Sequence, residues 1–335
     1  MPLPGDPVAP VLVIGAGAWG TALALSCARA GRQVFLWGRD PALIADIART
    51  RENTRHLPGV ALPPAIEPRA HLDDLTHTDP LVVLATPLQT TREVMTRALA
   101  CGFRRFACTA KGIETGTGLL VHEIVATVTH DAAAVAIVSG PTFAREVAEG
   151  RPTALTVASR DVVFGRELVA ALHTPSLRPY LTDDVPGVAV GGALKNVLAI
   201  AAGIADGLAL GANSRAALIT RGLAEMARFG TALGGRAETF MGLAGLGDLV
   251  LTCTDDQSRN RRFGLALGAG MPVAEAARRS GLVEGLPTAN ALMARADARG
   301  VDLPICREVA RTLRGECTPA AAVHTLMTRD LPSGV

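Results

Sequence analysis

The chain has 335 residues, of which 49% are hydrophobic and 19% are charged, and its formal net charge is +2. This length allows two domains with separate cores, and the composition excludes an intrinsically disordered chain. The basic residues are scattered and form no stripe with aromatic residues, so the sequence gives no support to nucleic-acid binding.

The first predicted element is a strand over 11–14, which is followed by a glycine-rich turn and a helix over 21–30. Gly15, Gly17 and Gly20 form a Gly-x-Gly-x-x-Gly pattern directly after four apolar residues. In a dinucleotide-binding unit the first glycine permits the tight turn, the second lets backbone amides approach a pyrophosphate, and the third lets the helix pack closely. The positive end of the helix dipole then faces the anion. This context favours a dinucleotide site over an ordinary glycine turn.

The second predicted strand, 32–39, ends where Rossmann-type domains select their nicotinamide cofactor. An NAD-preferring domain has a carboxylate there that binds the ribose hydroxyls, whereas this chain has Gly38 followed by Arg39. A guanidinium group pairs well with a 2′-phosphate, so NADP(H) is favoured and Arg39 is its candidate ligand. A solvated loop position for Arg39 is the alternative. Asp40, the expected N-cap of a helix toward Arg49, keeps NAD(H) open.

The rest of the first half alternates strand and helix, whereas the second half is helical. Further strands are predicted over 81–85, 103–109, 133–138, 152–159 and 177–182, and the last two could form an antiparallel edge. Helical patterns then cover 187–207, 213–232, 260–268, 287–299, 304–313 and 319–328. The predicted fold class is therefore α/β, with an N-terminal doubly wound Rossmann-type sheet in 1–186 and an all-α C-terminal domain in 187–335.

Cysteine spacing and hydropathy indicate the compartment. The six cysteines include no Cys-x-x-Cys pair and no His/Cys metal spacing, so we expect reduced thiols, no metal and a cytoplasmic protein. The N-terminal segment has prolines and no basic region, so no signal peptide is expected. The most apolar stretch, 185–211, contains Lys195, Asn196 and Asp206, which predicts a buried helix and not a membrane span.

Lys195 is the first candidate for chemistry. It precedes Asn196 in the sequence Gly-Gly-Ala-Leu-Lys-Asn, within an otherwise apolar helix. A buried lysine is costly and has a lowered pKa, which allows proton exchange near neutral pH. The alternative is a lysine that extends to the surface. The adjacent Asn196 and glycines favour a chemical role, and both residues are candidates for substrate binding.

Lys111 and Asp248 are the next candidates. Lys111 follows the predicted strand 103–109, and ligands bind at the carboxyl ends of strands in open α/β sheets. It is either a contact for an anionic substrate or a surface lysine. Asp248 is the one charged residue in the glycine-rich segment 241–249. It either caps a helix or forms a hydrogen bond with the lysine or a substrate hydroxyl.

A possible anion site lies at the start of the helix predicted over 260–268. Ser258 or a neighbour can cap this helix, and its free amides can bind an anion. Arg259 would add recognition of a phosphate by two parallel hydrogen bonds. Arg261 and Arg262 receive no role.

Together these motifs resemble bacterial NAD(P)-dependent glycerol-3-phosphate dehydrogenases. The order and spacing match from about residue 11 to 325, and the matching motifs are Gly-Ala-Gly-Ala-Trp-Gly-Thr-Ala-Leu-Ala (15–24), Ala-Lys-Gly (110–112), Ser-Gly-Pro-Thr-Phe-Ala (139–144), Gly-Ala-Leu-Lys-Asn (192–196), Gly-Leu-Gly-Asp-Leu (245–249) and Ser-Arg-Asn-Arg-Arg (258–262).

The resemblance implies a role for each matching position. Lys195 corresponds to the proton acceptor and donor of the family. Substrate contacts are implied for Lys111, Gly140, Thr142, Asp248, Ser258, Arg259 and Asn260. Cofactor contacts are implied for Ala18 through its backbone, Trp19, Arg39, Lys111, Ala144, Arg259, Leu282 and Glu284. The segment 282–285 is one residue shorter than usual, which affects Leu282 more than Glu284.

The implied reaction is the reversible reduction of dihydroxyacetone phosphate to sn-glycerol 3-phosphate, which supplies the backbone of glycerophospholipids. Lys195 would donate the proton, Asp248 would orient it, and Lys111 would add positive charge. The resemblance also implies a homodimer without stable membrane insertion. Two alternatives stay open: another two-domain dehydrogenase acting on a hydroxy acid or sugar phosphate, and a dinucleotide sensor without turnover.

Overall fold

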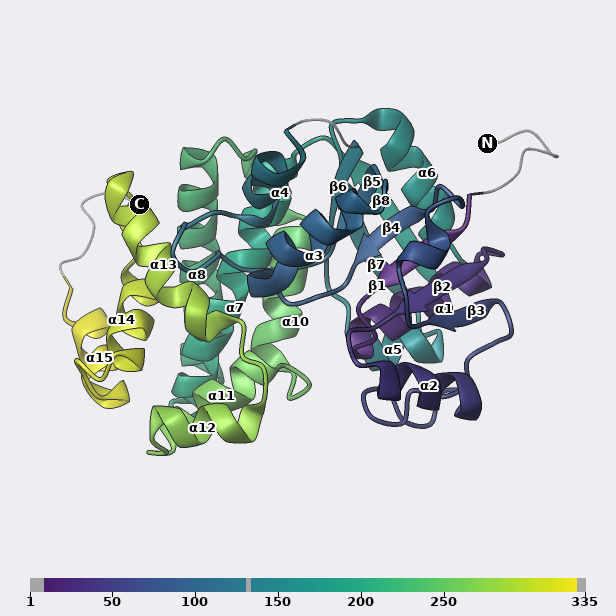
Figure 1. Cartoon of the computed structure of the whole chain (residues 1–335). Coiled ribbons are helices and arrows are strands. Elements are labelled where there is room, and N and C mark those ends of the chain that lie inside the picture. Colours follow the sequence, from purple (N-terminus) through teal and green to yellow (C-terminus); the bar gives the residue numbers. More distant parts are fainter. Residues whose placement is uncertain (1–8, 131–133, 330–335) are drawn as a thin grey trace. The chain divides into compact units, whose positions relative to one another are not determined.

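The computed structural model describes residues 9–130 and 134–329, and these form two compact units (Figure 1). The first unit contains the described residues up to Ala110 together with Val121–Val185. The second contains Lys111–Leu120 and the described residues from Pro186 onward. Lys111 therefore belongs by its contacts to the same unit as Lys195 and Asp248, although its sequence position precedes the last strands of the first unit.

The first unit is built on an eight-stranded sheet with the order β3-β2-β1-β4-β5-β6-β7-β8. All neighbours pair in parallel except β6 and β7, which are antiparallel, so β7 and β8 form an edge that runs against the other six strands. This result confirms the doubly wound sheet and its antiparallel edge. The strands are β1 (Val11–Ile14), β2 (Val34–Trp37), β3 (Ile66–Arg69), β4 (Leu81–Leu84), β5 (Arg105–Cys108), β6 (Ala134–Ser139), β7 (Thr153–Ala158) and β8 (Leu177–Thr182).

Strand β3 was not predicted because its sequence, Ile-Glu-Pro-Arg, contains a single apolar residue, two charged residues and a proline. Such a strand fits only at the edge of a sheet, where the missing amide costs no ladder hydrogen bond. By contrast, every residue of β1, β2 and β4 is buried. Continuous apolar runs of this kind are typical of parallel strands covered on both faces.

Six α-helices accompany the described part of this sheet: α1 (Ala18–Arg29), α2 (Pro41–Thr50), α3 (Leu88–Ala100), α4 (Val121–Thr129), α5 (Ala144–Glu149) and α6 (Val162–Leu172). One continuous apolar core joins α1, α2, α5 and α6 to one face of the strands. Helix α1 begins at Ala18, earlier than the predicted residue 21, because the glycine turn already has its last residues in the helix. A short 3-10 helix, η1, covers Asp73–Leu75.

The described part of the second unit contains helices and no strand, as predicted for residues after 186. These helices are α7 (Val185–Gly207), α8 (Gly211–Ala232), α9 (Ala237–Met241), the π-helix η2 (Leu243–Gly247), α10 (Asp248–Thr254), α11 (Arg259–Gly268), α12 (Val273–Ser280), α13 (Gly285–Ala298), α14 (Pro304–Leu313) and α15 (Pro319–Met327). Helices α9, η2, α10 and α12 are too short or too irregular to show a clear helical period and were not predicted.

Helix α7 is the long apolar helix that its sequence predicted. It is the one helix in the described residues long and apolar enough to cross a membrane, and its most apolar window is entirely buried within the protein. The prediction of a buried helix at this position is confirmed. Lys195 and Asn196 are therefore buried polar residues in its interior, and each needs partners.

Candidate functional site

Two lysines and one aspartate form an ion-paired cluster in the second unit, in which Lys195 and Asp248 are buried and Lys111 is half-buried. The Nζ atom of Lys111 donates to Oδ2 of Asp248 at 2.6 Å, and Nζ of Lys195 donates to Oδ1 of the same carboxylate. Asp248 is 1% exposed and Lys195 is 7% exposed. The predicted hydrogen bond between Asp248 and a lysine is present, and the aspartate bonds both predicted lysines.

Burial and neighbouring charges shift the pKa values of Lys195 and Asp248. Burial lowers the pKa of Lys195 to about 8, although Asp248 acts to raise it. Burial acts to raise the pKa of Asp248, but Lys111 and Lys195 outweigh it and hold this pKa below its usual value. The carboxylate therefore stays ionised between two ammonium groups, and the cluster carries a net positive charge. It attracts anions and contains one group that exchanges a proton near neutral pH.

The π-helix η2 sets the position of Asp248, the first residue of α10. Its backbone packs directly on α7, because a Cβ atom added at Gly191 would lie 2.3 Å from the carbonyl oxygen of Ala244. Single π-helical turns are uncommon and occur often at functional sites. Here the glycine-rich segment brings Asp248 close to α7, one side-chain length from Lys195.

Thr252 is a member of the cluster that the sequence reasoning missed. Lys195 Nζ donates to its hydroxyl at 3.1 Å, and this hydroxyl donates to the backbone oxygen of Asp248 at 2.6 Å. Thr252 follows Asp248 by four residues and so lies on the same face of α10. That spacing was the available signal, because a helix starting at Asp248 places both side chains toward the lysine.

Beside the cluster, a chain of hydrogen bonds through Asn196 and Asn260 joins the Glu284 carboxylate to the backbone of Gly285. The amide of Asn196 donates to Oε2 of Glu284 at 3.5 Å, and Asn260 donates to Oδ1 of Asn196 at 3.0 Å. Asn260 in turn accepts from the backbone amide of Gly285 at 2.9 Å. Burial raises the pKa of Glu284, while Arg259, Lys111 and Lys195 act to lower it. Glu284 therefore interacts electrostatically with four other predicted residues of this unit: Lys111, Lys195, Asn196 and Arg259.

The start of α11 has the predicted cap. Ser258 is the N-cap, and its Oγ atom accepts from the amide of Arg261 at 3.2 Å. Arg259 follows as the first helical residue and is exposed, so its guanidinium group is accessible. Leu282 is also exposed, whereas Glu284 is half-buried.

In the first unit, the glycine turn has the shape that a dinucleotide needs. Gly15 has a φ of +123°, and an added Cβ would lie 2.5 Å from the oxygen of Ala85. A Cβ at Gly20 would lie 1.8 Å from the oxygen of Gly15, whereas one at Gly17 would meet nothing within 4 Å. Gly15 and Gly20 are thus required for packing, and Gly17 leaves open space at the N-terminus of α1, which has no side-chain cap. These residues fit the pyrophosphate of a dinucleotide.

Arg39 and Asp40, which follow β2, differ in how many of their side-chain groups already have partners. One carboxylate oxygen of Asp40 accepts from the amides of Ala42 and Leu43 as the N-cap of α2, and the other pairs with Arg55 at 3.0 Å. Both oxygens of Asp40 are therefore engaged. Arg39 is exposed at the end of the strand.

The other predicted residues of this unit lie near the carboxyl ends of β1 and β6. Gly140 follows β6 with a φ of +149°, and an added Cβ would lie 2.9 Å from the Cα of Leu155. The hydroxyl of Thr142 donates to the oxygen of Gly140 at 3.2 Å, and Ala144 begins α5. Ala18 and Trp19 form the first turn of α1.

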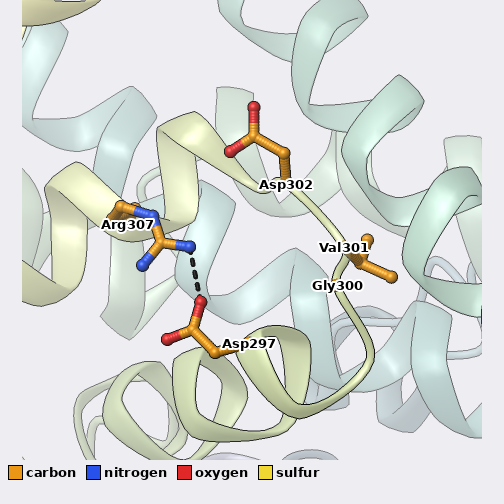
Figure 2. A pocket seen from close by; sticks show the side chains of 5 residues that line it. All are labelled: Asp297, Gly300, Val301, Asp302 and Arg307. Atoms are coloured by element: carbon orange, nitrogen blue, oxygen red, sulfur yellow. Dashed lines mark hydrogen bonds and ion pairs between the residues drawn. The ribbon is translucent and has the colours of Figure 1, made fainter.

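A separate hollow in the second unit is lined by none of the predicted residues. Figure 2 shows the residues that line it, with Asp297 and Arg307 joined by an ion pair; the others are Gly300, Val301 and Asp302. The Asp297–Arg307 ion pair measures 2.7 Å and is largely exposed. This pair is a surface contact between α13 and α14, and it adds nothing to the cluster at Lys195.

Sequence models of known families match both halves of the chain. The NAD-dependent glycerol-3-phosphate dehydrogenase N-terminus matches residues 10–164, and the C-terminus of the same family matches residues 184–324.

Individual relatives agree with this match. Glycerol-3-phosphate dehydrogenase [NAD(P)+] of Thioalkalivibrio sulfidiphilus is 50% identical over 324 residues, which are 96% of this chain and 97% of the relative. That of Variovorax paradoxus is 52% identical over 331 residues, with 96% and 97% covered. The crystal structure of glycerol-3-phosphate dehydrogenase from Coxiella burnetii superimposes with a TM-score of 0.90 at 42% identity, covering 96% of this chain and 99% of that one. The glycine turn, the lysine–aspartate cluster and these matches show that the chain belongs to the NAD-dependent glycerol-3-phosphate dehydrogenase family.

Proposed function

We propose that the protein catalyses the reversible, NAD(P)H-dependent reduction of dihydroxyacetone phosphate to sn-glycerol 3-phosphate. Relatives named glycerol-3-phosphate dehydrogenase [NAD(P)+] cover nearly the whole chain at about half identity. The observation that carries the proposal is the cluster in which Asp248 bonds both Lys111 and Lys195. This arrangement provides a proton donor and positive charge, which the reduction of a phosphorylated ketone requires.

Lys195 is the proposed proton donor. The bound dinucleotide supplies or accepts the hydride. As the ketone is reduced, negative charge develops on its oxygen, and the Lys195 ammonium supplies a proton to that atom. Asp248 and the Thr252 hydroxyl both accept hydrogen bonds from Nζ of Lys195 and so limit its orientation. Lys111 adds a second positive charge without needing to transfer a proton.

We assign the substrate phosphate to the start of α11. Ser258 and Asn260 have their side chains engaged in the cap and in the bonds to Asn196 and Gly285. The Ser258 amide also donates to the oxygen of Asp255 at 3.2 Å, so Ser258 shapes the site. The backbone amide of Asn260 and the guanidinium group of Arg259 are the proposed phosphate donors. Asn196, Gly140 and Thr142 complete the proposed substrate contacts.

The dinucleotide is assigned to the glycine turn. Gly15, Gly17 and Gly20 give its shape, the first turn of α1 at Ala18 and Trp19 provides amides, and Arg39 binds the 2′-phosphate of NADP(H). Because both carboxylate oxygens of Asp40 are engaged, its use for ribose hydroxyls is disfavoured. Further proposed contacts come from Lys111, Ala144, Arg259, Leu282 and Glu284.

The proposed cofactor domain spans 1–186 and the proposed substrate domain spans 187–335. Lys111 is assigned to the substrate domain although it precedes residue 187 in the sequence.

Initial rates with dihydroxyacetone phosphate, measured with NADH and NADPH in parallel, test the proposed function. We expect turnover with both cofactors and a higher kcat/KM with NADPH. A panel of hydroxy acids and sugar phosphates in the same assay is the comparison. Faster turnover of one of those compounds would replace the proposed substrate, and tight NADPH binding without any oxidation would favour a dinucleotide sensor.

The cellular setting is proposed from the family. A cytoplasmic homodimer that supplies glycerol phosphate for phospholipid synthesis fits the chain. Light scattering on the purified protein tests the oligomeric state, and a mass of one chain would contradict the dimer.

A further inference from the structure

Asn53 lies outside every motif of the sequence, yet it is bonded directly to the glycine turn. It stands in the loop after α2 and is 0% exposed. Its Nδ2 atom donates to the backbone oxygen of Ala16 at 3.0 Å and to Oγ1 of Thr21 at 2.8 Å. Its Oδ1 atom accepts from the amide of His56 at 3.2 Å. Both hydrogens of the amide and its oxygen are thus used, which is nearly the full capacity of an asparagine.

The bond to Ala16 controls the direction of the next amide. In a trans peptide the carbonyl and the following N–H lie in one plane and point in opposite directions. Asn53 holds the oxygen of Ala16 on the buried side, so the N–H of Gly17 is directed away from it. Gly17 is the position where an added Cβ would meet nothing within 4 Å. The hydrogen bond therefore fixes the orientation of the Gly17 amide at the N-terminus of α1.

The bond to Thr21 fixes the helix behind the turn. Thr21 is fully buried in the first turns of α1, and its own amide donates to the oxygen of Gly17 at 3.0 Å. Asn53 thereby joins residues on both sides of Gly17. An asparagine is suited to this position because a single planar amide reaches two acceptors with one nitrogen. Aspartate could make neither bond, because it has no donor when ionised.

The loop that carries Asn53 also contacts the end of β2. Arg55, two residues further, pairs with Asp40 at 3.0 Å, beside Arg39. One short loop is therefore attached to the glycine turn and to the end of β2, the two places assigned to the pyrophosphate and to the adenosine ribose.

We propose that Asn53 is a positioning residue for dinucleotide binding, which orients the Ala16–Gly17 peptide and the first turn of α1 toward the pyrophosphate. The inference rests on the assignment of the dinucleotide to the glycine turn. It does not depend on which substrate the enzyme reduces.

The test is the dissociation constant of NADPH, measured by fluorescence titration of the full-length Asn53→Ala variant. We expect the Kd of NADPH to rise about tenfold, because the Ala16–Gly17 peptide is no longer held in place in the free protein and binding must then order it. The KM for NADPH should rise in parallel, while kcat at saturating NADPH and the KM for dihydroxyacetone phosphate stay within about twofold of the wild type. A residue that only supports the fold would instead lower the thermal midpoint and kcat without changing the Kd.

Thr54→Ala is the matched control, because Thr54 is the exposed neighbour in the same loop and should leave the Kd unchanged. A folded Asn53→Ala variant that binds NADPH as the wild type does would overturn the inference.

If Asn53→Ala does not fold, the Thr21→Val variant tests the inference instead, because it keeps the side-chain shape and removes one acceptor of Asn53. A rise in Kd of a few-fold supports the inference, and an unchanged Kd refutes it. Failure of the wild type to reduce dihydroxyacetone phosphate would refute the proposed function alone, because the NADPH titration is independent of turnover.

Discussion

At the scale of single residues, two opposed effects set the pKa of Lys195 and therefore its ability to donate a proton. Removal from water disfavours its ammonium form, and the carboxylate of Asp248 favours it. Burial dominates, so the pKa falls to about 8 and not to the much lower values that an unpaired buried lysine reaches. Asp248 thus keeps Lys195 protonated at neutral pH, while burial keeps the proton transferable.

This balance predicts the pH dependence of the two reaction directions. Below a pH of about 8 the Lys195 ammonium form dominates, so kcat for ketone reduction should be highest there and should fall as the pH rises through about 8. Oxidation of the alcohol needs the neutral amine and should rise over the same range. Steady-state rates at saturating substrates from pH 6 to 10 measure both limbs.

The Asp248→Asn variant checks the cause of this dependence. Because Asp248 acts to raise the pKa of Lys195, its loss should move the fall in reduction to lower pH. A fall at the same or a higher pH would show that another group controls the profile.

Substitution of Arg259 should have a different kinetic effect from substitution of Lys195. The exposed guanidinium group of Arg259 is assigned to binding the phosphate and not to proton transfer. Replacing Arg259 by Ala should raise the KM for dihydroxyacetone phosphate by about 10- to 100-fold, as expected for lost hydrogen bonds between charged groups. The effect on kcat should be smaller. Arg262→Ala is the matched control on the same helix, since Arg262 is exposed and donates to the backbone oxygen of Asp256. An unchanged KM in Arg259→Ala would remove this residue from the phosphate site.

At the scale of elements, α7, which carries Lys195, crosses α11, which begins at Arg259, in close contact. Added Cβ atoms at Gly203 and Gly207 would lie 2.1 Å and 2.3 Å from backbone oxygens of α11. Added Cβ atoms at Gly264 and Gly268 would lie 2.1 Å and 2.4 Å from backbone oxygens of α7. Four glycines thus allow backbone-to-backbone contact, and the buried Arg261 adds an ion pair to Asp206 of α7 at 2.6 Å.

This crossing predicts that Gly264→Ala destabilises the second unit. The added methyl group would lie 2.1 Å from the oxygen of Ile200, and rigid backbone on both sides must shift. We expect a loss of about 1–3 kcal/mol in unfolding free energy, the usual cost of overpacking. Urea denaturation measures it. Gly242→Ala is the control, because its nearest contact would be an ordinary 3.4 Å to the oxygen of Thr239. Equal stability of Gly264→Ala and wild type would contradict the close crossing.

The same elements show what a sequence can and cannot predict here. Helix α14 was predicted with its observed bounds because Pro304 starts it and its apolar positions repeat regularly. Lys195 and Asp248 were found because a charge among apolar or glycine residues is costly and therefore conspicuous. Asn53 and Thr252 were missed because ordinary polar residues gain importance only from contacts that the fold creates. The π-helix η2 was missed for a similar reason, since close packing against Gly191 and not local propensity determines it.

At the scale of the whole molecule, the two units contribute different kinds of groups. The first contributes glycines and backbone amides at the end of β1, to which we assign the dinucleotide. The second contributes charged side chains around Lys195, including Lys111 from the segment Lys111–Leu120. Binding and chemistry should therefore be separable by substitutions in different units.

Two variants test this separation. Gly17→Ala should fold normally, since an added Cβ meets nothing within 4 Å and the φ of Gly17 is −80°. Its methyl group should instead block the approach of the pyrophosphate and weaken dinucleotide binding.

Lys195→Met keeps the apolar stem of the side chain and removes the proton donor, so turnover should be lost. NADPH at 100 times its Kd should stabilise the wild type and Lys195→Met alike by about 2.7 kcal/mol, and Gly17→Ala by much less.

Thermal unfolding with and without NADPH, together with kcat, measures both effects on the full-length protein. Lys195→Met should combine a normal thermal shift with a loss of kcat far greater than tenfold. Gly17→Ala should combine a normal midpoint in the absence of NADPH with a small shift in its presence. If Lys195→Met kept its turnover within tenfold of the wild type, Lys195 would not be the proton donor. If Gly17→Ala kept the full NADPH shift, the dinucleotide would have to bind away from the glycine turn.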